Sequence, residues 1–505
     1  MRQSSSPSER RGLFDGVLSA GPVHDAVSDR AWLQAMLDAE AALARAQARL
    51  GLVSPSAAAA ITEVCQAARF DAAALAHEAA DTGNPVVPLV RALRAQLRPE
   101  FAGQAHLGAT SQDIIDSAAM LVAHRATGPL RADLASAADR AAALAAEHRD
   151  ALIAGRTLLQ QALPTTFGLV AAGWMTALDA AGSRLARMRH GTLAVQLGGA
   201  VGTLAALGEP AETRDAAGGT AGTRAAPDGP ADTRTASDGP TAARTARDEP
   251  TGLPGRAGSA GVSARRNGLV GIALISAFAD ELELNEPILP WHTDRGRIAE
   301  LAGALAGAAG TIAKVARDVV LLAQTEVGEV REGGGRGGSS TMPHKANPIA
   351  AISAAASAAR APGLTATLYA AMPHEHQRAA GAWHAEWLPL TDLLRATGSA
   401  AHWLRECLGS LEIDVARMRA NLDLTGGALL AERVAGALAP TLGKDAAHDL
   451  IASVVRGGGT LADDPRITAH LDRDRVTALL DPAEYLGSAS ALIDRALAAH
   501  PKGDA

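Results

Sequence analysis

Apolar residues recur at helical spacing along most of the chain. One stripe ends at Gly51, with Pro55 beyond it, and consists of Trp32, Leu33, Met36, Leu37, Leu43 and Leu50. A longer stripe follows Pro290 and consists of Leu301, Leu305, Ile312, Val315, Val319 and Leu322. At a rise of 1.5 Å per residue, its roughly thirty residues predict a helix of about 45 Å. Both patterns favour a bundle of long helices.

Composition supports helices and limits the class of protein. The 505 residues are 48% hydrophobic and 3% aromatic, with Ala, Leu and Arg dominant, which favours helix over sheet. The formal net charge of −7 argues against a generally basic nucleic-acid binder. Because only Cys65 and Cys407 occur, we expect a reducing compartment without a disulfide framework. The N-terminus lacks an apolar signal core, so we expect a soluble cytoplasmic protein.

Two segments differ from the helical remainder. Residues 1–12 are rich in Ser and Arg and predict a disordered leader. Residues 210–266 are built from Ala, Gly, Thr, Asp, Arg and Pro, and Thr-Arg recurs there every ten residues. Such a stretch buries too little apolar surface to offset its ordering entropy, so we expect a disordered insertion.

The most unusual segment follows the long helix, from Gly333 to Pro348. Its glycines match the spacing of a dinucleotide-binding loop but follow a helix and not a strand, which excludes that interpretation. A flexible loop, with Asn347 capping a helix that has Pro348 at its first position, is one alternative. The other is a mobile lid whose serines and Lys345, one of only four lysines, act on an anionic substrate.

Three further polar segments are candidates for chemistry. Thr110 and Asp113 have the spacing of a capping box at a helix start, and such an N-terminus also binds carboxylates. Residues 155–168 predict a polar break between helices. His374 and His376 flank Glu375, but their spacing of two does not place both on one helix face. We therefore expect no metal and no cofactor.

Three of these segments together resemble the fumarase/aspartase superfamily. The signature loop Gly-Ser-Ser-x-Met-Pro-x-Lys-x-Asn-Pro is matched at every specified position by residues 338–348. The motif Thr-Ser-x-Asp is matched at 110–113, and Gln-x-Ala-x-Pro-x-Thr at 160–166. Apart from the insertion, the resemblance covers nearly the whole chain.

The resemblance implies an all-α, three-domain fold with a central five-helix bundle. Four chains would form a homotetramer with a twenty-helix core and active sites shared between subunits. The implied domains are an N-terminal helical domain (13–110), a central bundle (111–410, interrupted by 210–266) and a C-terminal helical domain (411–505). Ser339 would be the catalytic base and Lys345 a second catalytic residue. The implied substrate-binding residues are His106, Thr110, Ser111, Arg156, Gln160, Arg295, Ser340, Met342, Asn347 and Arg378.

Within the superfamily, the likeness is closest to the cycloisomerases of aromatic catabolism, carried by residues 83–90, 106–113, 290–293 and 375–387. It implies interconversion of 3-carboxy-cis,cis-muconate and a carboxymuconolactone, and hence a small tricarboxylate as the partner, without nucleic acid or membrane. Most superfamily lyases have a histidine where this chain has Leu158. A carboxylate with a pKa of about 4 leaves without a proton, which favours lactone chemistry. The alternatives are a fumarate-releasing lyase such as adenylosuccinate lyase, and a structural protein on the same scaffold.

Overall fold

The computed structural model describes residues 12–208, 259–338, 341–342 and 344–501, and these residues are mostly helical. Residues 1–11 of the predicted leader and residues 210–258 of the predicted insertion lie outside the described residues. Residues 259–266, which the composition assigns to the insertion, are instead the first turns of a helix that begins at Ser259. The apolar run that follows them supplies the tertiary contacts that their own composition lacks.

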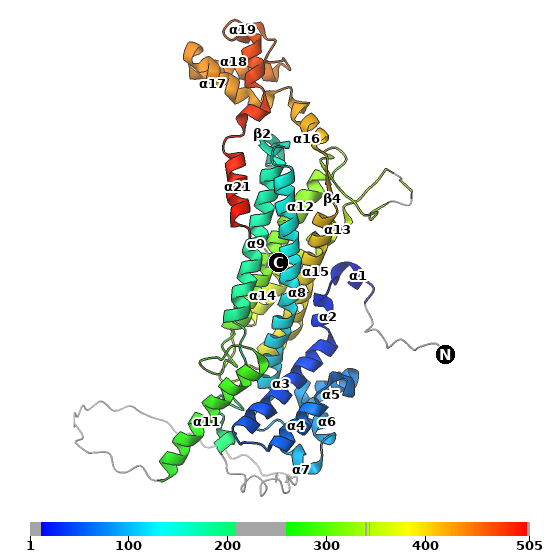
Figure 1. The fold of residues 1–505 in the computed structure, drawn as a ribbon, viewed down its shortest axis with the longest axis vertical. Helices are drawn as coiled ribbons and strands as arrows, with labels where there is room; N and C mark the ends of the chain where they lie inside the picture. The colour runs from blue at the N-terminus through cyan, green and yellow to red at the C-terminus, as the bar shows by residue number, and fades with distance from the viewer. Residues whose placement is uncertain (1–11, 209–258, 339–340, 343, 502–505) are drawn as a thin grey trace, which may run out of the picture.

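Long helices run along the centre of the elongated molecule (Figure 1). They are α8 (Ser111–Glu147), α9 (Phe167–Gly191), α12 (Gly296–Leu322) and α15 (Ala382–Gly409), whereas α11 (Ser259–Leu282) lies at the lower end, where it packs against α3. The predicted long stripe is confirmed as α12, and its apolar members point into the core. By length and composition α12 would also pass as a membrane span, but it packs against α9, α13 and α15. The predicted all-α class is confirmed.

Shorter helices surround the lower end of the bundle, where α8 begins (Figure 1). They are α3 (Asp29–Arg49), α4 (Pro55–Val64), α5 (Ala72–Thr82), α6 (Val86–Ala95) and α7 (Pro99–Ala102). The predicted first stripe is confirmed as α3, which packs against α8. Two short helices before it, α1 (Asp15–Leu18) and α2 (Val23–Ala26), lie against α15.

Two short antiparallel ribbons lie at the opposite end. β1 (Leu152–Thr157) pairs with β2 (Gln160–Thr166), so the predicted polar break between helices is in fact a hairpin. β3 (Val330–Glu332) pairs with β4 (Leu411–Ile413). The signature segment follows β3 and leads into α13 (Ile349–Ala358) and α14 (Ala361–Ala370).

The C-terminal helices have a second hydrophobic core of their own, which includes Val434, Leu438, Ile451 and Val476. The helices of this core are α17 (Ala431–Leu442), α18 (Lys444–Arg456), α19 (Pro465–Thr468) and α20 (Arg473–Leu479), whereas Met418 of α16 (Val415–Leu422) belongs to the main core. The last helix, α21 (Ala489–Ala499), returns to pack on α9 and α8. The domain boundaries at 110 and 410 stay a prediction.

Candidate active site

The Thr-Ser-x-Asp motif forms the N-terminus of α8. Thr110 is the N-cap, and the carboxylate of Asp113 accepts the Thr110 N–H at 2.9 Å, as the capping-box spacing predicts. Asp113 is fully buried and accepts four more hydrogen bonds, from Gly198 N–H, Gly199 N–H, His292 Nε2 and, at 3.5 Å, Gln196 Nε2. This carboxylate therefore fixes the helix start against the segment after α9. The first-turn N–H groups of so long a helix favour an anion.

His106 lies just before this helix start. Its Nδ1 is 2.6 Å from Oε1 of Glu40 on α3, and its φ of 59° is unusual for a residue other than glycine. Burial acts to lower the pKa of His106, but the charge and hydrogen bond of Glu40 outweigh it and the pKa is raised. The ring is thus held in one orientation beside the α8 terminus. A direct contact with substrate stays a prediction.

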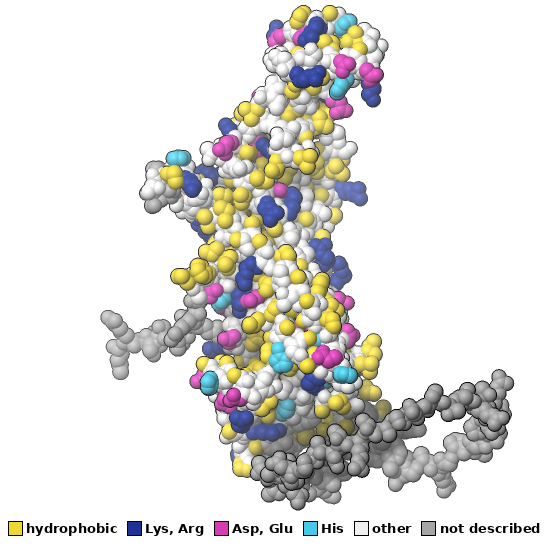
Figure 2. Space-filling model, turned by 180° about the vertical axis from the view of Figure 1, so that it is seen from behind, with side chains coloured by type: hydrophobic (Ala, Val, Ile, Leu, Met, Phe, Trp, Pro, Cys, Tyr) yellow, Lys and Arg dark blue, Asp and Glu magenta, His cyan; other side chains and the backbone are white. Residues whose placement is uncertain are grey.

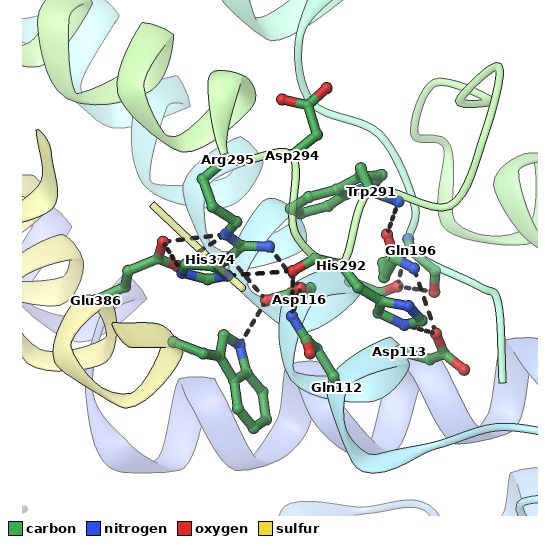
Figure 3. Close-up of polar contacts among 12 residues, drawn as sticks. Gln112, Asp113, Asp116, Gln196, Trp291, His292, Asp294, Arg295, His374 and Glu386 are labelled. Atoms are coloured by element: carbon green, nitrogen blue, oxygen red, sulfur yellow. Dashed lines mark hydrogen bonds and ion pairs between the residues drawn. The ribbon is translucent and has the colours of Figure 1, made fainter. Parts of the chain in front are cut away.

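A buried ionic cluster lies one turn further along α8 (Figure 3). Arg295, which is 2% exposed, donates from every guanidinium nitrogen to Asp116 on α8 or Glu386 on α15. Trp383 Nε1 also donates to Asp116, and His374 lies 3.4 Å from Glu386. The two carboxylates raise the pKa of Arg295 despite its burial, so the arginine stays charged.

This cluster corrects one sequence prediction. The superfamily resemblance implies that Arg295 is a substrate ligand, but this residue lies inside the protein, between two carboxylates that already satisfy its charge. Its role is to join the starts of α12 and α15 to α8. The sequence could not reveal these ion pairs, because Asp116 and Glu386 lie 179 and 91 residues from Arg295 along the chain.

The cluster and the motif form one continuous network. Gln112, which precedes Asp113, donates to Asp116 Oδ2 and to the carbonyl oxygen of His292. Arg378, predicted to bind substrate, lies beside this network and donates to the carbonyl oxygens of Gly199 and Ala200. Because Arg378 is only partly buried, its position is compatible with the prediction.

The other predicted arginine lies at the far end of the bundle. Arg156 on β1 donates from both Nη atoms to Glu329, at 2.7 and 2.9 Å, and the Glu329 side chain is fully buried. Asn421 donates to the same carboxylate. Glu329 directly precedes β3, so this pair holds the hairpin against the base of the signature loop. Sequence reasoning missed Glu329 because a single acidic residue in a loop carries no pattern.

The hairpin presents an exposed tip. Gln160, a predicted substrate ligand, is exposed at the start of β2. Leu158 and Leu159 form the two-residue turn, with φ of 52° and 65°, and are 96% and 70% exposed. A left-handed conformation costs about 1–2 kcal/mol for each such residue. An exposed, strained turn of two leucines is typical of a site that another chain or a ligand covers.

The signature loop is closed at its neck. Asn347 N–H and Asn347 Nδ2 both donate to the Gly337 carbonyl oxygen, and Gly338 bridges to Ala346. The alternative interpretation predicts that Asn347 caps α13. This prediction is wrong, because the Asn347 side chain bonds to Gly337. The Glu332 carboxylate performs that task by accepting the Ala350 and Ala351 N–H groups.

The tip of the loop extends from this neck. Lys345 and Met342 are exposed on it. The serines at 339 and 340, to which sequence analysis assigns the base and a substrate contact, lie outside the described residues.

One chain does not bring the three motifs together. Thr110 and Ser111 lie at the start of α8, while the hairpin follows its end, and the 37 residues of α8 span about 55 Å. The signature loop lies at the hairpin end, because Arg156 contacts Glu329 (Figure 1). Within the described residues, the motifs of one chain therefore lie at two ends of the bundle.

Known proteins resemble this chain over nearly its whole length. A family model described as Lyase matches residues 18–224 and 269–363. A 3-carboxy-cis,cis-muconate cycloisomerase from Pseudomonas aeruginosa is 42% identical over 97% of this chain and 96% of its own length. A nitrosuccinate lyase from Streptomyces davaonensis is 43% identical over 96% of this chain and 94% of its own length.

A solved structure shows the same fold. The 3-carboxy-cis,cis-muconate lactonizing enzyme from Pseudomonas putida superposes with a TM-score of 0.79 at 39% identity, covering 97% of this chain and 98% of that one. The resemblance inferred from the three motifs is thereby confirmed. Since relatives of nearly equal identity carry different activities, identity alone does not select the substrate.

Proposed function

Because the chain belongs to the Lyase family, we propose that it interconverts 3-carboxy-cis,cis-muconate and a carboxymuconolactone, a step of protocatechuate catabolism. Leu158 is the residue that favours a leaving group that needs no proton. It occupies the hairpin tip, the position where most superfamily lyases have a histidine that assists the leaving group, and a leucine side chain transfers no proton. In the lactone-opening direction the leaving group is a carboxylate, which needs none.

The proposed reaction adds one substrate carboxylate to an internal alkene. A new C–O bond forms, and the alkene electron pair moves to the neighbouring carbon, where its carboxylate delocalises it as an aci-carboxylate. The Ser339 hydroxyl then delivers a proton to that carbon, and in the reverse direction its alkoxide removes the proton. Lys345 and the α8 N-terminus at Thr110 and Ser111 would stabilise the negative charge. Asp113 and His292 hold that terminus in place.

The proposal includes a homotetramer with shared sites. The α8 terminus of one chain would meet the hairpin of a second chain and the signature loop of a third, since one chain separates them by the length of α8. Apolar side chains spread along the bundle support burial of this surface (Figure 2). The exposed apolar side chains of the bundle include Leu321 on α12, Ile352 on α13 and Tyr369 on α14, which are 39%, 42% and 47% exposed. We place the enzyme in the cytoplasm.

A second candidate is the elimination of nitrite from nitrosuccinate, with release of fumarate. The 43% identity to a nitrosuccinate lyase favours it. Leu158 is compatible with this reaction too, because nitrite, like a carboxylate, is the anion of a moderately strong acid and leaves unprotonated. An amine leaving group, as in adenylosuccinate, lacks this property, so Leu158 argues against that alternative.

A side-by-side ultraviolet assay tests the proposal. Purified protein is mixed with 3-carboxy-cis,cis-muconate, nitrosuccinate or adenylosuccinate, and loss of the diene or formation of fumarate is followed. We expect rapid loss of the diene and a kcat/KM for it well above that for the other two. A higher kcat/KM for nitrosuccinate would replace the first candidate by the second. Ser339→Ala should lose about 10²–10⁴ of kcat on the preferred substrate without dissociating the oligomer.

A further inference from the structure

Glycine occupies five of the six positions from 333 to 338, at the start of the signature loop. Gly334, Gly335 and Gly337 have positive φ, of 82°, 72° and 79°. Glycine loses more backbone freedom on ordering than any other residue, and it has no side chain whose contacts could offset that loss. We call residues 333–337 the first limb of the loop. Arg336 is the one residue of the first limb that has a side chain to anchor it.

Arg336 lies against α15. Its Nη2 donates to Oε2 of Glu406 at 2.6 Å, and its guanidinium carbon lies 5.6 Å from the centre of the Trp403 ring. Glu406 and Trp403 are three residues apart, so they share one face of α15. The hydrogen bond from Arg336 holds the pKa of Glu406 below its usual range, so the carboxylate stays charged. Both contacts therefore attract the arginine cation.

The two partners of the arginine are themselves fixed to the body of the protein. The other oxygen of Glu406, Oε1, accepts from Arg405 at 2.9 Å, and Arg405 Nη1 lies 3.1 Å from Oδ1 of Asp133, which is buried on α8. Trp403 Nε1 donates at 2.8 Å to the carbonyl oxygen of Val17 in α1. An isolated exposed ion pair contributes little, but an ion pair within a network contributes more. The first limb therefore meets a preformed acceptor on the bundle.

The arginine contacts lie between two backbone contacts of the first limb. On one side, the Gly333 N–H donates to the carbonyl oxygen of Ser410 at 2.8 Å. On the other side, the Gly337 carbonyl oxygen accepts from Asn347 and forms the neck. The position of the Gly337 carbonyl depends on where Arg336 is held, so Arg336 determines whether Asn347 can reach it.

We propose that Arg336 is a positioning residue that holds the first limb on α15 and thereby places Lys345 for the reaction. This inference rests on the proposed function, in which Lys345 stabilises the negative charge of the aci-carboxylate. Lys345 lies two residues before Asn347, so a displaced neck moves it directly. The arginine itself contacts no substrate and transfers no proton. The superfamily signature begins at Gly338 and does not include Arg336.

Arg336→Met keeps an unbranched side chain and removes its charge, so it tests the inference in the full-length protein. We expect kcat on 3-carboxy-cis,cis-muconate to fall about tenfold with KM within about twofold of wild type, because the lost charge stabilisation acts mainly in the transition state. Hydrogen exchange of a peptide covering residues 344–348 measures the neck without substrate, since the Asn347 N–H forms one of its hydrogen bonds. This exchange should be faster in Arg336→Met.

Three further variants separate positioning from a general loss of stability. Arg336→Lys keeps a cation, and because Arg336 donates to Glu406 from one nitrogen only, the lysine should restore most of kcat and slow the exchange. Arg331→Met breaks an exposed ion pair with Glu412 on the β3–β4 ribbon and should change neither measurement. Glu406→Gln should lower kcat as Arg336→Met does, and the double variant should lose no more kcat than Arg336→Met alone.

The outcomes distinguish this inference from the proposed function. If wild type converts the diene, unchanged exchange in Arg336→Met would overturn the inference whatever the kinetics, and the function would stand. Faster exchange with wild-type kcat would show that the neck does not place Lys345, which overturns the inference as well. If wild type does not convert the diene, the function is overturned and exchange alone decides: faster exchange in Arg336→Met than in Arg331→Met supports the anchor of the first limb, and equal exchange overturns both.

Discussion

His292 Nε2 lies 2.7 Å from Oδ1 of Asp113, and both side chains are buried. The pair joins two motifs that are 179 residues apart in sequence. Asp113 in turn holds the Thr110 N–H, so the position of the α8 N-terminus depends on His292. His292 acts on the proposed reaction through this contact and is a positioning residue.

Replacing His292 by Phe should therefore affect both stability and turnover. Asp113 would lose one buried donor, which we expect to cost about 1–3 kcal/mol of unfolding free energy. The shifted helix terminus should lower kcat more than it changes KM. Denaturant unfolding and steady-state kinetics measure the two effects. His376→Phe is the control, because that side chain is exposed. Wild-type kcat in the His292 variant would show that Asp113 keeps the terminus in place alone.

Arg295 supports a second prediction. Arg295→Met removes the one cation between Asp116 and Glu386 and leaves two buried carboxylates facing each other. We expect a loss of about 3–5 kcal/mol, measured by chemical denaturation. Arg331→Met, which breaks an exposed pair with Glu412, should cost about 1 kcal/mol or less. Equal losses in both variants would show that the buried cluster contributes no special stability.

The elements that the sequence predicted are those whose information is local and periodic. The α3 and α12 stripes fall on one helix face each, and burial follows directly from that spacing. The hairpin was missed because residues 152–166 show no strict alternation, and its turn uses Leu158 and Leu159 in a conformation that favours glycine or asparagine. Propensity gives no hint of such a turn.

The residues of the candidate site that could be predicted from the sequence also depend on local information. The motif at Thr110–Asp113 was recognised as a helix start because its capping residues lie within one turn. Arg295 was predicted to be a ligand because its carboxylate partners are distant in sequence. From sequence alone, an arginine is equally compatible with substrate binding and with a buried ion pair.

The neck of the signature loop leads to a third prediction. Gly337 has a φ of 79°, and a Cβ there would lie 2.1 Å from the Asn347 carbonyl oxygen. Gly337→Ala should therefore open the neck, displace Lys345 and lower kcat about 100-fold, since an error of 1 Å in positioning has effects of that size. Gly335→Ala is the matched control. Its φ of 72° is similar, but a Cβ there meets nothing within 4 Å. Equal activity in the two variants would exclude the Gly337–Asn347 contact as the cause.

The C-terminal helix should respond to pH through His500. The Nδ1 and Nε2 atoms of this residue lie 2.8 and 3.0 Å from carboxylates of Asp179 on α9 and Asp139 on α8. Burial acts to lower the pKa of His500, but the two carboxylates outweigh it and the pKa is raised above 6.5. The protonated ring therefore stabilises the docked helix fully below pH 6.5, and this stabilisation is lost as the pH rises through the raised pKa.

Hydrogen exchange of α21 at pH 6 and pH 8.5, corrected for the intrinsic pH dependence of exchange, measures this effect. We expect lower protection of residues 489–499 at the higher pH in wild type and no such change in His500→Gln, which keeps a hydrogen-bonding side chain but does not titrate. Arg149→Gln is the control, because it weakens the contact between Arg149 and Asp494 of α21, an ion pair that does not titrate in this range. A pH response that persists in His500→Gln would place the sensor at another residue.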